Sequence, residues 1–317
     1  MKFKKIVGVD ETLLNASALE QLHSLGEEVF MYHDFPLQEK EIIDRIGNAD
    51  CLLVSFRTLI TRAVLDACPN IRYIGMCCTL YDPSSCNVDV IEAYRRGITV
   101  LGVKDYGDEG VVEYVICELV RLLHGFGGVR WLKESTELTQ RKIGIVGLGK
   151  TGRMIADALS FLGAYVSYYS KTRKPEAEKV GIVYRPLEEL LADVEIVCTC
   201  LPRNNYILGE KEFELMGNGK ILVNTSVGQT FQTEAICNWL RNCPDSFYLC
   251  DATGMGGLQD RLNGFPNVLY TPYISGKSIQ SIERLSQKVL ANMRIISLLI
   301  DFAISCKSLS KFCTGEV

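Results

Sequence analysis

A glycine fingerprint at the end of a predicted strand constrains this chain more than any other feature. The pattern is G-x-G-x-x-G, and its glycines are Gly147, Gly149 and Gly152. The apolar run 142–146 predicts a buried parallel strand before it, and apolar residues at helical spacing from Met154 predict a helix after it. A second strand is predicted at 164–169. A fingerprint set between two strands and a helix favours a dinucleotide-binding unit over an ordinary glycine-rich turn.

Each fingerprint glycine has a mechanical role in such a unit. Gly147 allows the tight turn, Gly149 lets the backbone approach a pyrophosphate, and Gly152 lets the helix pack on the strand. The helix then starts at Lys150 and Thr151. Its free N–H groups and positive dipole end favour phosphate. We therefore expect these five residues to bind the cofactor.

The end of the second strand indicates which nucleotide is bound. A free ribose 2′-hydroxyl is usually held there by Asp or Glu. Here the position falls at Ser170, followed by Lys171 and Arg173, with no carboxylate before Glu176. A hydroxyl and nearby cations suit a 2′-phosphate, for which Arg offers paired donors. The residues predict NADP(H), with NAD(H) possible; the alternative is a solvated basic loop.

Composition limits the classes of protein to which the chain can belong. Of its 317 residues 47% are hydrophobic and 23% charged, with a net charge of −4. These values are typical of a globular protein and give no reason to expect nucleic acid as a partner. No apolar run reaches 18 residues and no signal peptide precedes the first strand, so we expect a cytoplasmic protein without a membrane partner. The 13 cysteines are scattered without a C-x-x-C pair, which predicts no metal site.

Strands alternate with helices of about ten residues along the chain. This alternation predicts an α/β fold with doubly wound parallel sheets. Strands are predicted in the first third, which has no fingerprint of its own, at 5–10, 28–33, 49–56, 71–78 and 98–103. Beyond the fingerprint they are predicted at 195–200, 221–225, 247–250 and 268–270. A long amphipathic helix is predicted at 277–304.

The carboxyl ends of these strands define a candidate site, because ligands of such sheets bind there. Further cofactor-binding residues are expected at these ends: Cys200, Leu201, Pro202, Ser226 and Asp251. Tyr273 follows the last strand. Asp108 and Glu109 are expected to be solvated loop residues.

Several segments, in one order, carry a family resemblance. They are PNIRYIG with RRGITVLGV, DEGVVEYVICELV, KIGIVGLGKTGRMIADALSFLGA, PLEELLADVEIVCTCLP, ILVNTS and LYTP. Through them nearly the whole chain resembles the D-isomer-specific 2-hydroxyacid dehydrogenases. The resemblance implies an NAD(P)-dependent oxidoreductase with two Rossmann-like domains: a flavodoxin-like substrate domain (1–104 and 276–317) and an NAD(P)-binding Rossmann domain (105–275). It also implies a homodimer formed largely through the coenzyme domains.

The family's catalytic residues do not carry over by this resemblance. Its carboxylate-binding arginine falls at Val227, its glutamate at Gly256 and its acid/base histidine at Tyr273, while Asp251 is retained and would contact the nicotinamide end. A phenol, with a usual pKa of about 10, is a poor base at neutral pH. Losing a matched acid/base costs about 10²–10⁴-fold in rate. None of the three histidines lies at a strand end of the coenzyme domain.

Tyr273 admits two interpretations. With Lys277 it forms Y-x-x-x-K, a spacing that lowers a tyrosine pKa in short-chain reductases but requires a helix through Gly276. The alternative is that Tyr273 only fills the space of the histidine.

Three hypotheses for function remain open. The first is a superfamily member with weak or altered activity on 2-hydroxy and 2-oxo acids. The second is an inactive nucleotide-sensing or regulatory dimer. The third is a reductase of a carbonyl substrate without a carboxylate, with Tyr273 as the acid. The physiological small-molecule substrate is not specified by the residues.

Overall fold

The chain divides into two compact units. The computed structural model describes residues 2–81, 83–203 and 205–314, apart from the side chains of residues 84 and 300–314. Unit 1 comprises Met1–Tyr106 and Ile279–Val317, and unit 2 comprises Gly107–Ser278. The sequence placed the division at 104/105 and at 275/276.

Unit 1 is built on a five-stranded parallel sheet in the order β2-β1-β3-β4-β5. Its strands are β1 (Phe3–Gly8), β2 (Gly26–Met31), β3 (Cys51–Val54), β4 (Tyr73–Met76) and β5 (Thr99–Leu101). Its helices are α1 (Ala16–Leu25), α2 (Glu39–Ile46), α3 (Arg62–Ala67), α4 (Val90–Arg95) and α13 (Ile279–Thr314), with a 3₁₀ turn η1 (Pro83–Ser85). The order reverses between β1 and β3, the switch point where ligands of flavodoxin-like sheets bind.

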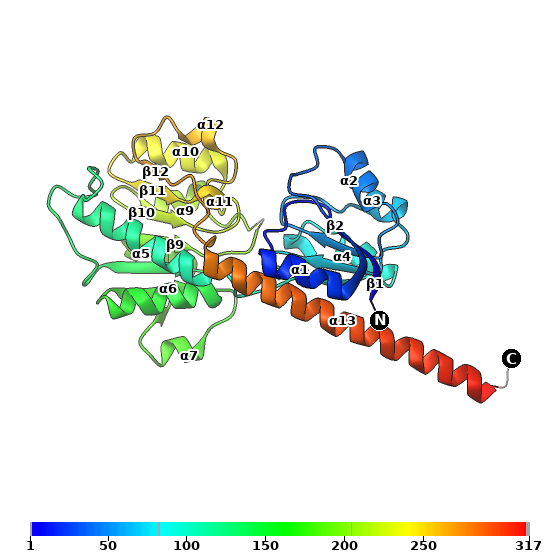
Figure 1. Cartoon of the computed structure of the whole chain (residues 1–317). Helices are drawn as coiled ribbons and strands as arrows, with labels where there is room; N and C mark the ends of the chain where they lie inside the picture. The colour runs from blue at the N-terminus through cyan, green and yellow to red at the C-terminus, as the bar shows by residue number, and fades with distance from the viewer. Residues whose placement is uncertain (1, 82, 204, 315–317) are drawn as a thin grey trace. The chain divides into compact units, whose positions relative to one another are not determined.

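Two apolar clusters cover the faces of this sheet. Helices α2, α3 and α4 pack on one face around buried residues such as Ile46, Leu65 and Ala93. Helices α1 and α13 lie side by side on the other face, where Leu22 and Met293 are buried (Figure 1). The C-terminal helix therefore belongs to the core of unit 1, although the rest of that unit comes from the start of the chain.

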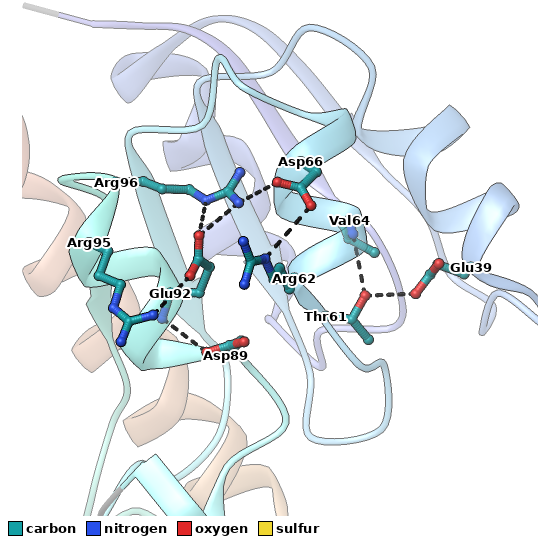
Figure 2. A network of polar contacts seen from close by, with 9 residues as sticks. All are labelled: Glu39, Thr61, Arg62, Val64, Asp66, Asp89, Glu92, Arg95 and Arg96. Atoms are coloured by element: carbon teal, nitrogen blue, oxygen red, sulfur yellow. Dashed lines mark hydrogen bonds and ion pairs between the residues drawn. The ribbon is translucent and has the colours of Figure 1, made fainter.

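A polar network joins α3 to the segment that follows α4 (Figure 2). Arg96 donates to Asp66 on α3 and to Glu92 on α4. Thr61 accepts a hydrogen bond from the Val64 N–H and so caps the start of α3. The network fixes two neighbouring helices of unit 1 by charge-assisted contacts at its surface.

Unit 2 contains a seven-stranded parallel sheet in the order β12-β11-β10-β9-β6-β7-β8. The strands are β6 (Lys142–Val146), β7 (Tyr165–Tyr169), β8 (Val183–Tyr184), β9 (Ile196–Thr199), β10 (Ile221–Asn224), β11 (Phe247–Cys250) and β12 (Val268–Tyr270). The order reverses between β6 and β9. The fingerprint follows β6, so it lies at the switch point of this sheet.

Helices cover both faces of the second sheet. They are α5 (Asp108–His124), α6 (Lys150–Phe161), α7 (Pro175–Glu178), α8 (Leu187–Asp193), α9 (Glu210–Met216), α10 (Thr233–Asn242), α11 (Ala252–Met255) and α12 (Gln259–Leu262). Residues of α5, α6 and α7 share one apolar cluster, and residues of α8 to α12 share the other. Both sheets thus have two covered faces, as parallel sheets require.

The predicted α/β class with doubly wound parallel sheets is confirmed. The sequence missed α7, α11, α12 and β8, which have four residues or fewer, too few for a helical or strand period to show. Within the described part of the chain, no helix combines the length and the apolarity needed to cross a membrane.

Candidate dinucleotide site

The fingerprint turn has the geometry that its glycines predict. Gly147 has φ +99°, in the region that side chains rarely adopt, and a Cβ there would lie 2.5 Å from the Cys200 carbonyl oxygen. A Cβ on Gly152 would collide with the carbonyl oxygen of Gly147. A Cβ on Gly149, in contrast, would have no heavy atom within 4 Å. Gly149 therefore leaves open space where a phosphate could approach.

The start of α6 has free N–H groups of the kind that bind anions. Gly149 is the N-cap of the helix, and no side chain caps the free N–H groups of this turn. Lys150 is exposed beside them. Thr151, also expected to bind the cofactor, donates its hydroxyl to Asp108. This hydroxyl is therefore already engaged within the protein.

The expectation that Asp108 is a solvated loop residue is wrong. Asp108 is the first residue of α5 and only 9% of its surface is exposed. Its carboxylate lies against the first turn of α6 through Thr151, 43 residues away in the chain. The sequence carried no signal for this contact, because it depends on how two helices converge.

The residues after β9 and β10 are tied to each other. The Leu201 N–H donates to the Ser226 hydroxyl at 3.0 Å, and that hydroxyl donates to the Thr199 carbonyl at 3.2 Å. Burial, and then the Asp108 carboxylate, raise the pKa of the Cys200 thiol to about 12. The side chains of Cys200 and Ser226 therefore shape the loop, and the Cys200 thiol is protonated and unreactive at neutral pH. Pro202 follows on the same loop and is partly exposed.

The basic segment after β7 is exposed, but one of its cations is paired. Arg173 donates to the Glu178 carboxylate and lies over the Tyr184 ring at 5.0 Å. The bond from Arg173 lowers the pKa of Glu178 and raises that of Arg173. The sequence analysis missed Glu178. Lys171 has no carboxylate within 4 Å among the described residues, and Ser170 is half-buried beside it.

Asp251, at the end of β11, is fully buried and hydrogen-bonded through both carboxylate oxygens. One oxygen accepts from the Gly254 N–H and the Thr253 hydroxyl, each at 2.7 Å. The other accepts from the N–H and hydroxyl of Ser275, at 2.9 and 2.7 Å. Asp251 thus caps α11 and fastens the segment after β12 to it. Four protein donors satisfy this carboxylate, as a buried charge requires.

The positions Val227, Gly256 and Tyr273 lie on loops that backbone hydrogen bonds join. Gly228, next to Val227, donates to the Thr253 carbonyl at 3.0 Å. Ala252 donates to the Tyr273 carbonyl at 3.0 Å. Val227 is 42% exposed and Tyr273 is 76% exposed. The structure therefore brings together three adjoining loops at the carboxyl ends of β10, β11 and β12.

The Y-x-x-x-K interpretation of Tyr273 and Lys277 is wrong. No helix spans these residues, because α13 begins only at Ile279. The two side chains are both exposed on an irregular segment. The spacing of four residues brings two side chains onto one face only within a helix.

The described residues contain no group of three or more His, Cys, Asp or Glu side chains that could hold a metal ion.

Residues 127–275 match the NAD-binding domain of the D-isomer specific 2-hydroxyacid dehydrogenases. This segment holds the fingerprint and all the strands of unit 2. A hydroxypyruvate reductase of Blautia hydrogenotrophica is 27% identical over 312 residues, which cover 91% of this chain and 95% of that protein. Over residues 127–275 the chain is similar to this dehydrogenase family. The fingerprint lies within the segment that matches this NAD-binding domain.

Two further proteins are similar to this chain over most of their length. A glyoxylate reductase of Pyrococcus furiosus is 27% identical over 284 residues, which cover 81% of this chain and 82% of that protein. A solved acyclic imino acid reductase, in complex with NADPH and D-Arg, has a TM-score of 0.80 at 23% identity. It covers 94% of this chain and 97% of its own. This likeness shows that the two chains share a fold.

Proposed function

We propose that the protein is an NADP(H)-preferring member of the family whose activity on 2-hydroxy and 2-oxo acids is weak or altered. One observation carries the proposal: the three adjoining loops hold Val227, Gly256 and Tyr273 where the resemblance places the arginine, glutamate and histidine. Valine offers no charge or hydrogen bond for a substrate carboxylate. The glycine offers no carboxylate to orient a base.

Steady-state oxidation of NADPH with glyoxylate or hydroxypyruvate tests this proposal. We expect little or no turnover. The substitutions Val227→Arg, Gly256→Glu and Tyr273→His should raise the rate appreciably only when combined, because such residues act as a unit. Turnover of tens per second by the unmodified protein, a usual enzyme rate, would refute the altered-activity proposal.

The preference for NADP(H) is supported by the segment after β7. Lys171 has no carboxylate partner among the described residues, and Ser170 stands where a ribose-binding acid is usual. Arg173 keeps part of its planar donor set, although Glu178 takes two of its N–H groups. One or two charge-assisted bonds to a 2′-phosphate, at about 1.5–3 kcal/mol each, predict at least about tenfold tighter NADPH binding.

Nucleotide fluorescence titration measures this discrimination. Lys171→Ala should weaken NADPH binding while leaving NADH binding nearly unchanged. Lys179→Ala is a matched control, because Lys179 is paired with Glu176 on the same exposed segment. Equal affinities for the two nucleotides in the unmodified protein would contradict the preference.

A nucleotide-sensing dimer is the second candidate, and the homodimer itself is proposed from the family resemblance. Exposed aromatic side chains on unit 2 support a protein contact there: Phe126, Phe161 and Tyr165. Sedimentation of the protein with and without NADPH tests it. A monomer under both conditions would exclude this candidate.

The third candidate is a carbonyl reductase with Tyr273 as the acid. Its main support is that Tyr273 is exposed while its backbone is held by Ala252. If an uncharged carbonyl compound is reduced, Tyr273→Phe should abolish the activity. If instead a 2-oxo acid is reduced, a cation must bind the substrate carboxylate in place of an arginine at position 227.

A further inference from the structure

A buried carboxylate lies at the phosphate-binding end of α6. Asp108 accepts the hydroxyl hydrogen of Thr151, the second residue of that helix. The same carboxylate acts on the buried Cys200 thiol and helps to raise its pKa. Asp108 is thus within reach of both the first turn of α6 and the strand end after β9, the two segments that meet at Gly147 and Gly152.

A negative charge at this place opposes the binding of an anion at the N-terminus of α6. The first N–H groups of a fingerprint helix bind the pyrophosphate, which carries two negative charges. Among the described residues, no cation lies within 4 Å of the Asp108 carboxylate, and the hydroxyl of Thr151 donates a hydrogen bond to it. A negative charge that is neither paired nor exposed is screened weakly. It therefore repels a phosphate that approaches the same turn.

We propose that Asp108 sets the affinity of the dinucleotide site by opposing the pyrophosphate, so that cofactor binds weakly and leaves readily. The inference rests on the proposed dinucleotide site but not on any catalytic activity. In the free protein the Asp108 carboxylate lies beside the first turn of α6, where it accepts a hydrogen bond from the Thr151 hydroxyl. On binding, its charge persists beside the pyrophosphate and the complex is destabilised by their repulsion.

Replacing the charge while keeping the hydrogen bond tests the proposal. Asp108→Asn retains an oxygen that accepts from Thr151, and Asp108→Thr is a second neutral variant should Asn fold poorly. Fluorescence titration should show NADPH and NADH binding about tenfold more tightly to the neutral variants, equivalent to about 1.4 kcal/mol. Competition should show the same gain for ADP-ribose, which contains the pyrophosphate. Adenosine 2′-monophosphate lacks it, and its affinity should not change.

Two controls separate charge from structure. Glu109→Gln removes an equal charge from the adjacent exposed residue and should change the affinities less than twofold. Thr151→Val removes the hydrogen bond but keeps the carboxylate, so it should not tighten binding. A purely structural role predicts instead that Asp108→Asn and Thr151→Val both weaken binding.

Each other outcome overturns the proposal. Unchanged or weaker dinucleotide binding to the neutral variants would show that Asp108 does not oppose the pyrophosphate, and weaker binding would point to a bond from its carboxylate to a ribose hydroxyl. Tighter binding of adenosine 2′-monophosphate would place the effect away from the pyrophosphate. Failure of the unmodified protein and every Asp108 variant to bind dinucleotide would refute the site itself.

Discussion

We expect Gly149→Asp to weaken cofactor binding without destabilising the fold. Gly149 is the N-cap of α6 with φ −80° and ψ −160°, an extended conformation open to any residue. A side chain added there meets no heavy atom within 4 Å at its Cβ. Aspartate is a favoured N-cap and exceeds glycine by a few tenths of a kcal/mol. We therefore expect the free energy of unfolding to stay the same or to rise slightly.

The cost to nucleotide binding follows from charge. The new carboxylate would stand in front of the N–H groups that are proposed to bind the pyrophosphate. Two like charges about 4 Å apart repel by about 4 kcal/mol at an effective dielectric constant of about 20. If solvent screening halves this value, about 2 kcal/mol remains, and the dissociation constant should rise about 30-fold.

Fluorescence titration with NADPH and a thermal melt measure the two effects. Gly149→Asn is the matched control, since asparagine also caps helices and has the same shape without the charge. Its loss of affinity reports steric intrusion alone, and the difference between Asp and Asn isolates the electrostatic part. If Gly149→Asp is folded and binds NADPH within about threefold of the unmodified protein, the pyrophosphate does not lie at this turn.

Three further predictions concern the same unit. Gly152→Ala should lower the melting temperature, because the added carbon overlaps a backbone oxygen and overpacking costs about 1–3 kcal/mol; an unchanged melt would contradict this close packing. Site-resolved mass spectrometry after maleimide treatment at pH 8 should find the exposed Cys117 modified and Cys200 intact, since burial raises the pKa of Cys200 to about 12; rapid labelling of Cys200 would show that its loop opens. Glu178→Gln should tighten binding of NADPH but not of NADH by freeing Arg173, and titrations showing equal changes for both nucleotides would exclude a 2′-phosphate contact.

The architecture was predictable because its signals are local. Apolar runs of strand length alternate with helical spacing, and this alternation predicts parallel sheets with helices on both faces. The positive φ of Gly147 and the close approach at Gly152 follow from the fingerprint pattern in the same way. The short elements α7, α11, α12 and β8 were not predicted, because a segment of four residues or fewer is too short to show a helical or strand period.

The partners of the charged side chains were not predictable. Asp108 meets Thr151 over 43 residues, and Asp251 meets Ser275 over 24. Such pairs depend on the side-by-side placement of strands and helix ends that lie far apart in the chain. Even Arg173 and Glu178, only five residues apart, meet because the chain turns between them.

The sequence by itself determined the fold class and the glycine fingerprint, because burial patterns and backbone conformations are properties of neighbouring residues. The substitutions at Val227, Gly256 and Tyr273 stay a proposal from the family resemblance. Only the tertiary structure decided which of the candidate side chains are free to act. In that structure the hydroxyls of Thr151 and Ser226 and the carboxylate of Asp251 form hydrogen bonds within the protein. Asp108 is buried beside α6. The physical reason is that hydrogen bonds and electrostatic interactions depend on distances of a few ångströms, which the packing of distant segments determines.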